Sequence, residues 1–201
     1  MSQRDFWRGE FGNSYIERNE SQELISSNIV LFSEIFRRSK IFPTSILEIG
    51  ANIGLNLSAI RQLFPDCKMS GVEINEKAAN LLEKTGAEVI RGSIEEVTLV
   101  AKYDLVFTKG VLIHIDPDSL KQTYEKILNS TKRWILFIEY YSRTPTEIVY
   151  RGHQGVLFKR DFAGEFLDQF CDKVHLIDYG FVYHRDKFPQ DDLTWFLLEK
   201  I

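Results

Sequence analysis

A glycine-rich turn follows the first apolar run of the chain, and a carboxylate stands at the end of the next apolar run. The segment ILEIGANIGLN contains Gly50 and Gly54, with Glu48 two positions before the first glycine. Glu73 ends the run GVEI further along the chain. Glycine permits a tight turn, and a carboxylate at the end of a second strand can accept hydrogen bonds from both hydroxyls of a ribose. These residues predict a site for a ligand that contains a nucleoside.

The glycine spacing argues against a dinucleotide site. The G-x-G-x-x-G pattern of such a site would fall on Gly50, Asn52 and Leu55, so two of its glycines are replaced here. Glu48 would also repel a pyrophosphate, whereas it suits a ligand that carries positive charge. The alternatives are an ordinary strand-to-helix turn for the glycines and a surface helix cap for Glu73.

The composition is that of a globular protein whose partners are small molecules or other proteins. A chain of 201 residues with 44% hydrophobic and 27% charged residues fits one ordinary domain with its own core. A net charge of −4 argues against a nucleic-acid binder. No apolar run approaches the roughly 20 residues of a membrane span, and the polar N-terminus is unlike a signal peptide. We expect a cytoplasmic protein in which Cys67 and Cys171 are reduced thiols, with no bound metal, nucleic acid or membrane.

Strands and helices that alternate along the chain must position these residues. Strands are expected at residues 45–50, 68–74, 87–92, 103–108 and 133–141. Helices are expected at residues 20–38, 53–64, 76–85, 117–129 and 161–170. Asn75 and Asp116 are typical N-caps, Pro117 suits the first helical position, and Pro65 ends a helix. This alternation predicts a parallel sheet with helices on both faces.

The end of the chain departs from this alternation. Residues 174–184 and 193–200 are rich in strand formers, and the link between them is too short for a helix, so they form an antiparallel pair. We therefore expect a Rossmann-like α/β fold in which five parallel strands precede a C-terminal hairpin. One domain would span residues 1–201, with an N-terminal lid and helix at 1–40 and a ligand-binding core at 45–201.

The motifs together resemble the class I S-adenosylmethionine (AdoMet)-dependent methyltransferases. Residues 46–56 match the first motif of that family, with Asn52 where the middle glycine usually stands, and Glu73 matches its ribose-binding acid. Residues 92–94 occupy the place of the adenine-contacting segment, and residues 104–115 match the fourth motif, which lines the methyl end. The resemblance implies AdoMet as cofactor and S-adenosylhomocysteine as product. The cofactor-binding residues that it implies are Glu48, Gly50, Asn52, Gly54, Asn56, Glu73, Ile74, Ser93, Ile94, Thr108, Lys109 and Gly110.

Longer strings resemble a narrower family, the methylases associated with pseudaminic acid biosynthesis. They are DFWRGEFGNSYIERN at residues 5–19, the segment 139–168, and the ending DYGFVYHRD…FPQDDLTWFLLEK. This resemblance covers nearly the full chain. It implies that the acceptor is a small anionic sugar or sugar nucleotide, an intermediate of surface-glycan synthesis.

A sugar acid gives the basic segment RGHQGVLFKRD a candidate role, since that segment leaves the fifth strand at the edge where the cofactor motifs end. Arginine can bind a carboxylate with two parallel hydrogen bonds, and aromatic rings offer flat faces to a sugar. The alternative for each basic side chain is a surface ion pair of little energy. The expected substrate-binding residues are Trp7, Phe11, Tyr15, Tyr140, Tyr141, Arg143, Tyr150, Arg151, Lys159 and Arg160.

Three residues are candidates for the base that an acceptor hydroxyl needs. His114 follows the fourth strand, Glu139 ends the fifth, and His153 lies within the basic segment; the sequence does not choose among them. O-methylation is favoured over N-methylation because sugars carry more hydroxyls. We expect an AdoMet-dependent methyltransferase (EC 2.1.1.-). The alternatives are a methyltransferase of another small metabolite, a non-catalytic partner protein with this fold, or a nucleotide-dependent oxidoreductase.

Overall fold

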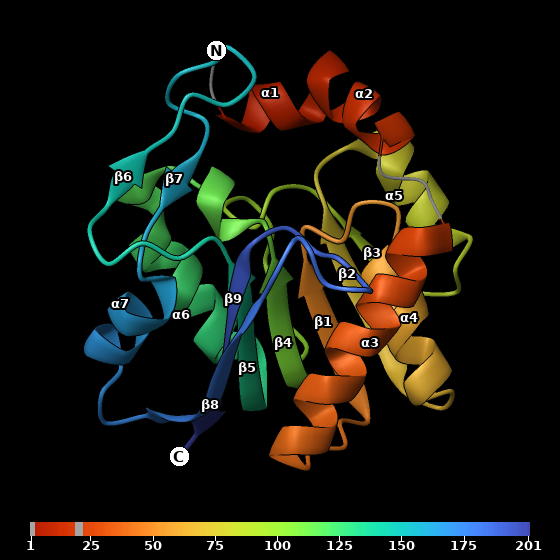
Figure 1. Ribbon diagram of the computed structural model, residues 1–201, viewed down its shortest axis with the longest axis vertical. Helices are drawn as coiled ribbons and strands as arrows, with labels where there is room; N and C mark the ends of the chain where they lie inside the picture. The colour runs from red at the N-terminus through yellow and green to blue at the C-terminus, as the bar shows by residue number, and fades with distance from the viewer. Residues whose placement is uncertain (1–2, 19–21) are drawn as a thin grey trace.

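A seven-stranded sheet forms the centre of the protein in the computed structural model, which describes residues 3–18 and 22–201 (Figure 1). Its strands are β1 (Ser45–Ile49), β2 (Lys68–Glu73), β3 (Glu88–Arg91), β4 (Tyr103–Lys109), β5 (Thr131–Glu139), β8 (Val174–Val182) and β9 (Leu193–Lys200). They lie in the order β3-β2-β1-β4-β5-β9-β8. The strands β1 to β5 are parallel, and β9 runs antiparallel to both β5 and β8. The predicted Rossmann-like fold with a C-terminal hairpin is confirmed.

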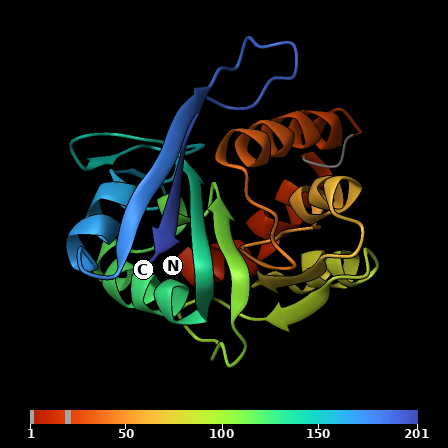
Figure 2. The ribbon, with the colours of Figure 1, turned by 90° about the horizontal axis from the view of Figure 1, so that it is seen from below.

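Helices cover both faces of the sheet (Figure 2). One face carries α3 (Gln22–Ser39), α4 (Leu55–Leu63) and α5 (Glu76–Glu83), and the other carries α6 (Leu120–Ser130) and α7 (Phe162–Gln169). The two faces follow from the alternation of side chains along each strand: Ile46 packs toward α3, whereas Leu47 and Ile49 pack toward α6. No described helix is both long enough and apolar enough to cross a lipid bilayer.

The predicted helix caps are present. The Asn75 side chain accepts a hydrogen bond from the backbone N–H of Ala78 at 3.0 Å and begins α5. Asp116 accepts from the N–H of Asp118 at 3.0 Å and opens a short 3-10 turn, Pro117–Ser119, that continues into α6. The predicted helix at residues 20–38 corresponds to α3, although its expected first two residues lie outside the described part of the chain.

Two features were not predicted. The N-terminal segment consists of two helices, α1 (Gln3–Arg8) and α2 (Glu10–Arg18), which lie across the carboxyl edge of the sheet (Figure 1). The basic segment takes part in a second, two-stranded antiparallel sheet made of β6 (Thr146–Glu147) and β7 (Phe158–Lys159). Strands of two residues are too short to give a recognisable alternating pattern.

Candidate functional site

A cavity of about 540 Å³ lies at the carboxyl ends of β1, β2 and β4, beneath α1. This volume is in the range of small-molecule sites. The predicted cofactor residues that line it are Gly50, Asn52, Asn56, Glu73, Ile74, Ser93, Ile94, Lys109 and Gly110. Among the other predicted residues, Trp7, Tyr15 and His114 also line it. The carboxyl edge of the sheet therefore brings together motifs that are far apart in the sequence.

The turn after β1 needs left-handed backbone at three positions. Gly50 has φ +70°, Asn52 has φ +48° and Gly54 has φ +83°. Asparagine tolerates this conformation better than most residues, so its presence at a usual glycine position is compatible with the turn. A Cβ atom on Gly54 would approach the Leu82 side chain to 2.7 Å, so Gly54 faces α5 and does not line the cavity. Gly54, which was expected among the cofactor-binding residues, instead allows close packing against α5 in this structure.

Glu73 lies at the end of β2 with its carboxylate held by backbone donors. One oxygen accepts from the N–H of Asn52 at 2.7 Å, and the other accepts from the N–H of Asn75 at 2.7 Å. Burial raises the pKa of the Glu73 carboxyl, and the hydrogen bonds from these N–H groups lower it. Each carboxylate oxygen can accept more than one hydrogen bond. The group is thus fixed in place and can still accept two hydroxyl donors from a ligand.

Glu48 lies behind the cavity wall instead of in it. Asn56, which does line the cavity, donates from Nδ2 to Glu48 Oε1 at 2.6 Å. Burial raises the pKa of Glu48 to about 8, so the carboxyl is mostly protonated at neutral pH. Glu48, which was expected to contact the cofactor, lies outside the cavity lining, and Asn56 stands between its carboxyl and the cavity. Thr108 is likewise fully buried outside the cavity and donates to Glu139 at 2.8 Å.

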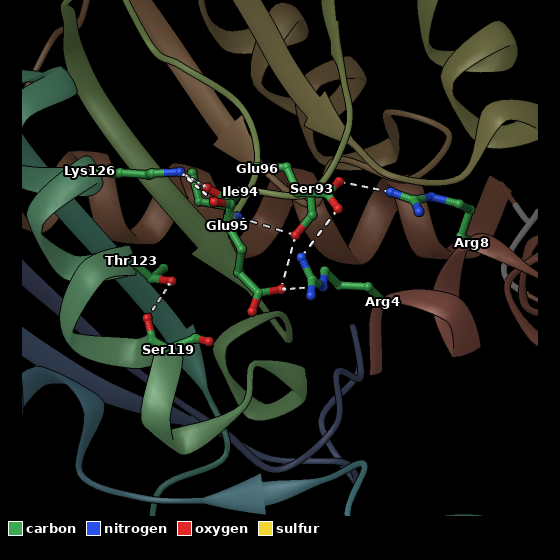
Figure 3. Close-up of polar contacts among 9 residues, drawn as sticks. All are labelled: Arg4, Arg8, Ser93, Ile94, Glu95, Glu96, Ser119, Thr123 and Lys126. Carbon is green, nitrogen blue, oxygen red and sulfur yellow. Dashed lines mark hydrogen bonds and ion pairs between the residues drawn. The ribbon is translucent and has the colours of Figure 1, made fainter. Parts of the chain in front are cut away.

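The turn after β3 forms one wall of the cavity and is held from two sides (Figure 3). The ammonium group of Lys126 on α6 donates to the carbonyl oxygens of Ile94, Glu95 and Val97 at 2.8, 2.7 and 3.0 Å. On the other side lie Arg4 and Arg8 of α1. They pair with Glu96 at 3.2 and 2.8 Å, and Arg4 also lies 3.9 Å from Glu95. Ion pairs therefore join the N-terminal helix to this wall.

His114 is the one candidate base that the structure places in the cavity lining. Its Nδ1 lies 2.7 Å from the carbonyl oxygen of Val156, so Nδ1 carries the proton and donates it, and Nε2 keeps a lone pair. Burial lowers the pKa of His114 to about 4, and the ring is neutral at pH 7. Trp7 packs against it with ring centroids 4.4 Å apart.

Glu139 and His153 do not line this cavity. Glu139 is buried below the turn after β4, where Oε1 accepts from the N–H groups of Val111 and Leu112 at 3.1 Å. Burial raises its pKa to about 7. His153 is exposed and packs on the ring of Phe6. Glu139 thus supports the turn that carries His114, and His153 lies outside.

The basic segment does not present its charges to the cavity, contrary to expectation. Arg160 pairs with Glu165 at 2.7 Å, Lys159 lies over the ring of Tyr140, and Arg151 lies over the ring of Tyr150. Arg143 is exposed. The backbone of the segment, in contrast, contacts residues that line the cavity. The carbonyl oxygen of Val156 orients His114, and the carbonyl oxygen of Gly155 accepts a hydrogen bond from Gln3 at 3.0 Å.

The remaining predicted aromatic residues lie behind the lining. Tyr140 donates from its hydroxyl to Asp191 at 2.8 Å, and Tyr150 packs between Phe11 and His114, with ring centroids 6.0 and 5.5 Å away. Tyr141 is 44% exposed and faces the hairpin strand β9 instead. Tyr140 and Tyr150 thus contact residues that line the cavity without lining it themselves.

Several lining residues were missed by the sequence prediction. They include Gln3, Arg4, Asn28, Asn75, Glu95, His184, Gln190 and Asp191. One of them carried a sequence signal: Asn28 lies one helical turn before Phe32 on the apolar face of α3, and a polar residue inside an apolar face is unusual. The loop that carries Gln190 and Asp191 has no pattern that would place it over the sheet.

Residues 46–133 match the family model described as a methyltransferase domain. No curated protein matches the chain. Among solved structures, magnesium protoporphyrin IX methyltransferase from Synechocystis PCC 6803 with bound SAH (S-adenosylhomocysteine) has a TM-score of 0.72 at 12% identity, over 98% of each chain. An S-adenosylmethionine-dependent methyltransferase from Clostridium acetobutylicum ATCC 824 has a TM-score of 0.64 at 12% identity, over 94% of this chain and 97% of that one.

A third structure, the mitomycin 7-O-methyltransferase MmcR, has a TM-score of 0.70 at 14% identity, over 100% of this chain and 61% of that one. Likeness at such low identity shows the fold. The predicted cofactor is the one held by the protoporphyrin methyltransferase structures, which contain SAM (S-adenosylmethionine) or SAH. The chain therefore has the Rossmann-like fold of these methyltransferases, and its residues 46–133 match a methyltransferase domain.

Proposed function

We propose that this protein transfers a methyl group from AdoMet to a small-molecule acceptor, and that both bind in the cavity at the carboxyl edge of the sheet. The observation that carries the proposal is Glu73. Its carboxylate lies in the cavity, at the end of the second strand, and is fixed by the backbone of the glycine turn. This is the arrangement that a ribose with two free hydroxyls requires.

The residues around Glu73 fit the rest of the donor. Ser93 and Ile94 would flank the adenine, while the 50–56 turn and Lys109 would lie along the amino-acid end. Buried polar atoms without a hydrogen-bond partner also gather here. Among the described residues they include Trp7 Nε1 and Asn56 Oδ1 in lining residues, and Glu48 Oε2 directly behind Asn56. Buried polar groups are normally paired, so a polar ligand is expected to complete this site.

His114 would accept the proton of the acceptor. The donor supplies an already activated methyl group, so the protein mainly aligns the acceptor and excludes water. With Nδ1–H donated to the 156 carbonyl, Nε2 can accept the proton of a hydroxyl as its oxygen takes the methyl group. Trp7 and Tyr15 would cover this end from the side of α1 and α2.

For the acceptor we propose a small anionic sugar or sugar nucleotide of the pseudaminic acid type. The support is the resemblance of residues 5–19 and 139–168 to the methylases associated with that pathway. O-methylation remains the favoured reaction, and a cytoplasmic location stays a prediction. Because the basic segment lies outside the cavity lining, its arginines do not provide the acid-binding contact in this structure.

Binding and transfer can be tested separately. Calorimetric titration is expected to show tight binding of S-adenosylhomocysteine and none of NAD(H); the reverse result would exclude the methyltransferase in favour of an oxidoreductase. Incubation with methyl-labelled AdoMet and a panel of sugar acids and sugar nucleotides then tests transfer. Donor binding without transfer to any acceptor would favour a non-catalytic partner protein.

A further inference from the structure

The side-chain amino group of Lys109 lies in the cavity without a close partner among the described residues. Lys109 ends β4 and lines the cavity. Within the part of the chain that the structure describes, no hydrogen bond or ion pair within 4.0 Å involves its Nζ. Burial lowers the pKa of Lys109, whereas the more distant carboxyls of Glu48, Asp191 and Glu139 raise it. A ligand with negative charge would give this amino group a close partner and would favour its charged form.

Asn28 on α3 offers a second donor to the same cavity. Only 3% of Asn28 is exposed, and its Oδ1 accepts a hydrogen bond from Gln190 Nε2 at 2.9 Å. The Nδ2 group has no partner among the described residues, and Asn28 lines the cavity. The hydrogen bond from Gln190 fixes the amide so that its N–H groups remain available to a ligand.

The packing of α3 on the sheet places Asn28 and Lys109 at the same height. The rings of Phe32 and Phe107 touch, with centroids 5.5 Å apart. Asn28 is one helical turn before Phe32, about 6 Å along α3. Lys109 is two strand residues after Phe107, about 6–7 Å along β4 and on the same face. Because α3 runs antiparallel to the parallel strands, both steps lead to the carboxyl edge of the sheet (Figure 1).

We propose that Lys109 and Asn28 form a carboxylate-binding subsite in the cavity. This subsite rests on the proposed function, because it lies in the cavity where AdoMet and the acceptor are proposed to bind. The carboxylate has two candidate sources, the amino-acid end of AdoMet or the acid group of the acceptor. In either case it accepts a charge-assisted hydrogen bond from Lys109 and a neutral one from Asn28.

Asp191 is the acidic residue that such a carboxylate would face across the cavity. Its Oδ2 accepts the hydrogen bond of the Tyr140 hydroxyl at 2.8 Å, which offsets part of its negative charge. Asp191 also favours the charged form of Lys109. Glu48 does not compete, because it lies outside the lining and is mostly protonated at neutral pH.

The test compares ligands that differ only in the carboxylate. Dissociation constants are measured by calorimetry for S-adenosylhomocysteine and for 5′-methylthioadenosine, which has the same nucleoside and sulfur without the amino-acid part. A second pair, N-acetylneuraminate and its methyl ester, is titrated in the presence of S-adenosylhomocysteine. The variants are Lys109→Met and Asn28→Asp, and the control is Lys132→Met, the same change at a surface lysine that pairs with Asp104.

Loss of the ammonium is expected to weaken the binding of the carboxylate ligand about tenfold or more. If Lys109→Met weakens the binding of S-adenosylhomocysteine but not that of 5′-methylthioadenosine, the carboxylate belongs to the donor. If Lys109→Met leaves the affinity for S-adenosylhomocysteine unchanged and weakens the binding of N-acetylneuraminate but not of its methyl ester, the carboxylate belongs to the acceptor. Asn28→Asp, which puts a negative charge in the subsite, is expected to act in the same direction, and Lys132→Met is expected to change nothing.

Two results would overturn the subsite alone. The first is that wild-type protein binds S-adenosylhomocysteine and methylthioadenosine, while Lys109→Met does not change the affinity for S-adenosylhomocysteine or for N-acetylneuraminate. The other is an equal loss of methylthioadenosine, which would mean that the substitution damages the nucleoside site. Wild-type protein that binds neither nucleoside instead overturns the proposed function, and the subsite with it.

Discussion

Two carboxyl groups at the ends of adjacent strands have different hydrogen-bond partners and different access to the cavity. Glu73 receives two backbone hydrogen bonds at 2.7 Å and lines the cavity, whereas Glu48 receives one side-chain hydrogen bond and is enclosed. The sequence located both residues, because each ends an apolar run beside a turn. It could not show that Asn56 would stand between Glu48 and the cavity, since that depends on the packing of α4 against β1.

The first prediction concerns Glu73. Glu73→Ala removes the expected ribose acceptor and also the two contacts that hold the turn, so it should weaken S-adenosylhomocysteine binding by about 1.5–3 kcal/mol. Glu73→Gln is the matched variant, because it keeps the shape and one acceptor oxygen, and it should lose less. Calorimetric dissociation constants measure both effects. Equal affinity of wild type and Glu73→Ala would mean that the ribose lies elsewhere.

The second prediction concerns Glu48 and pH. Its carboxyl has a pKa of about 8 in the folded protein and its ordinary value of 4.5 in the unfolded chain, so the unfolded chain releases its proton first as the pH rises. The free energy of unfolding contributed by this group is therefore fully present below pH 4.5 and is lost between pH 4.5 and 8. Glu48→Gln removes this loss. The variant should gain on wild type by an amount of the order of 2 kcal/mol between pH 5 and pH 8.

Urea unfolding of both proteins at pH 5, 6.5 and 8 measures this difference. If the free energies of unfolding of the two proteins change in parallel over that range, Glu48 is ionised in the folded protein, and burial does not raise its pKa.

At the scale of elements, α1 acts as a cover joined to two walls of the cavity. Its arginines pair with the turn after β3, and Gln3 donates to the 155 carbonyl of the basic segment. The sequence predicted an N-terminal lid and a segment leaving β5 at the cavity edge, and the structure places both there. It did not show which way the basic side chains point, because Lys159 is placed by the β6–β7 pairing, which joins residues more than ten positions apart.

The third prediction concerns the ion pairs of this cover. Glu96→Ala removes the partner of both Arg4 and Arg8, and exposed pairs contribute about 0–1 kcal/mol each. S-adenosylhomocysteine should therefore dissociate a few-fold faster, while the free energy of unfolding changes little. In wild type, the dissociation rate should rise with salt, and in the variant it should depend less on salt. Stopped-flow fluorescence of the three tryptophans can follow the release.

Glu76→Ala is the control for this experiment, since it breaks a surface ion pair between Glu76 on α5 and Arg91 on β3 that does not involve α1. A dissociation rate that is the same in wild type and Glu96→Ala at low salt would show that the ion pairs do not retain the ligand.

At the scale of the whole molecule, the fold was predictable because its strands and helices alternate strongly and carry their own caps and breakers. Asn75, Asp116 and Pro117 each mark a boundary that the structure contains. The floor of the cavity was predictable, and so were Trp7 and Tyr15 in its cover. Its upper parts come from α1, α3 and the β8–β9 loop, and which of their residues meet over the sheet is decided by long-range contacts such as that between Asn28 and Gln190.

The fourth prediction concerns the stability of the whole protein with ligand. A ligand that binds only the folded state at 100 times its dissociation constant adds about 2.7 kcal/mol to the free energy of unfolding. For a domain of this size, S-adenosylhomocysteine should therefore raise the melting temperature by about 5–10 °C. NADH at the same concentration should have no effect, and an equal shift with NADH would contradict a methyltransferase site. Thermal unfolding followed by circular dichroism measures the shift.

The boundary of the matched domain has an evolutionary consequence. Residues 46–133 supply the floor with Glu73, Ser93 and Lys109, whereas Trp7, Asn28 and Asp191 come from the flanking segments. If the proposed function holds, changes in the flanks would therefore alter the cover and one side of the cavity while Glu73 and Ser93 stay in place. A chimaera that joins this floor to the flanks of another such protein should inherit its acceptor from the flanks.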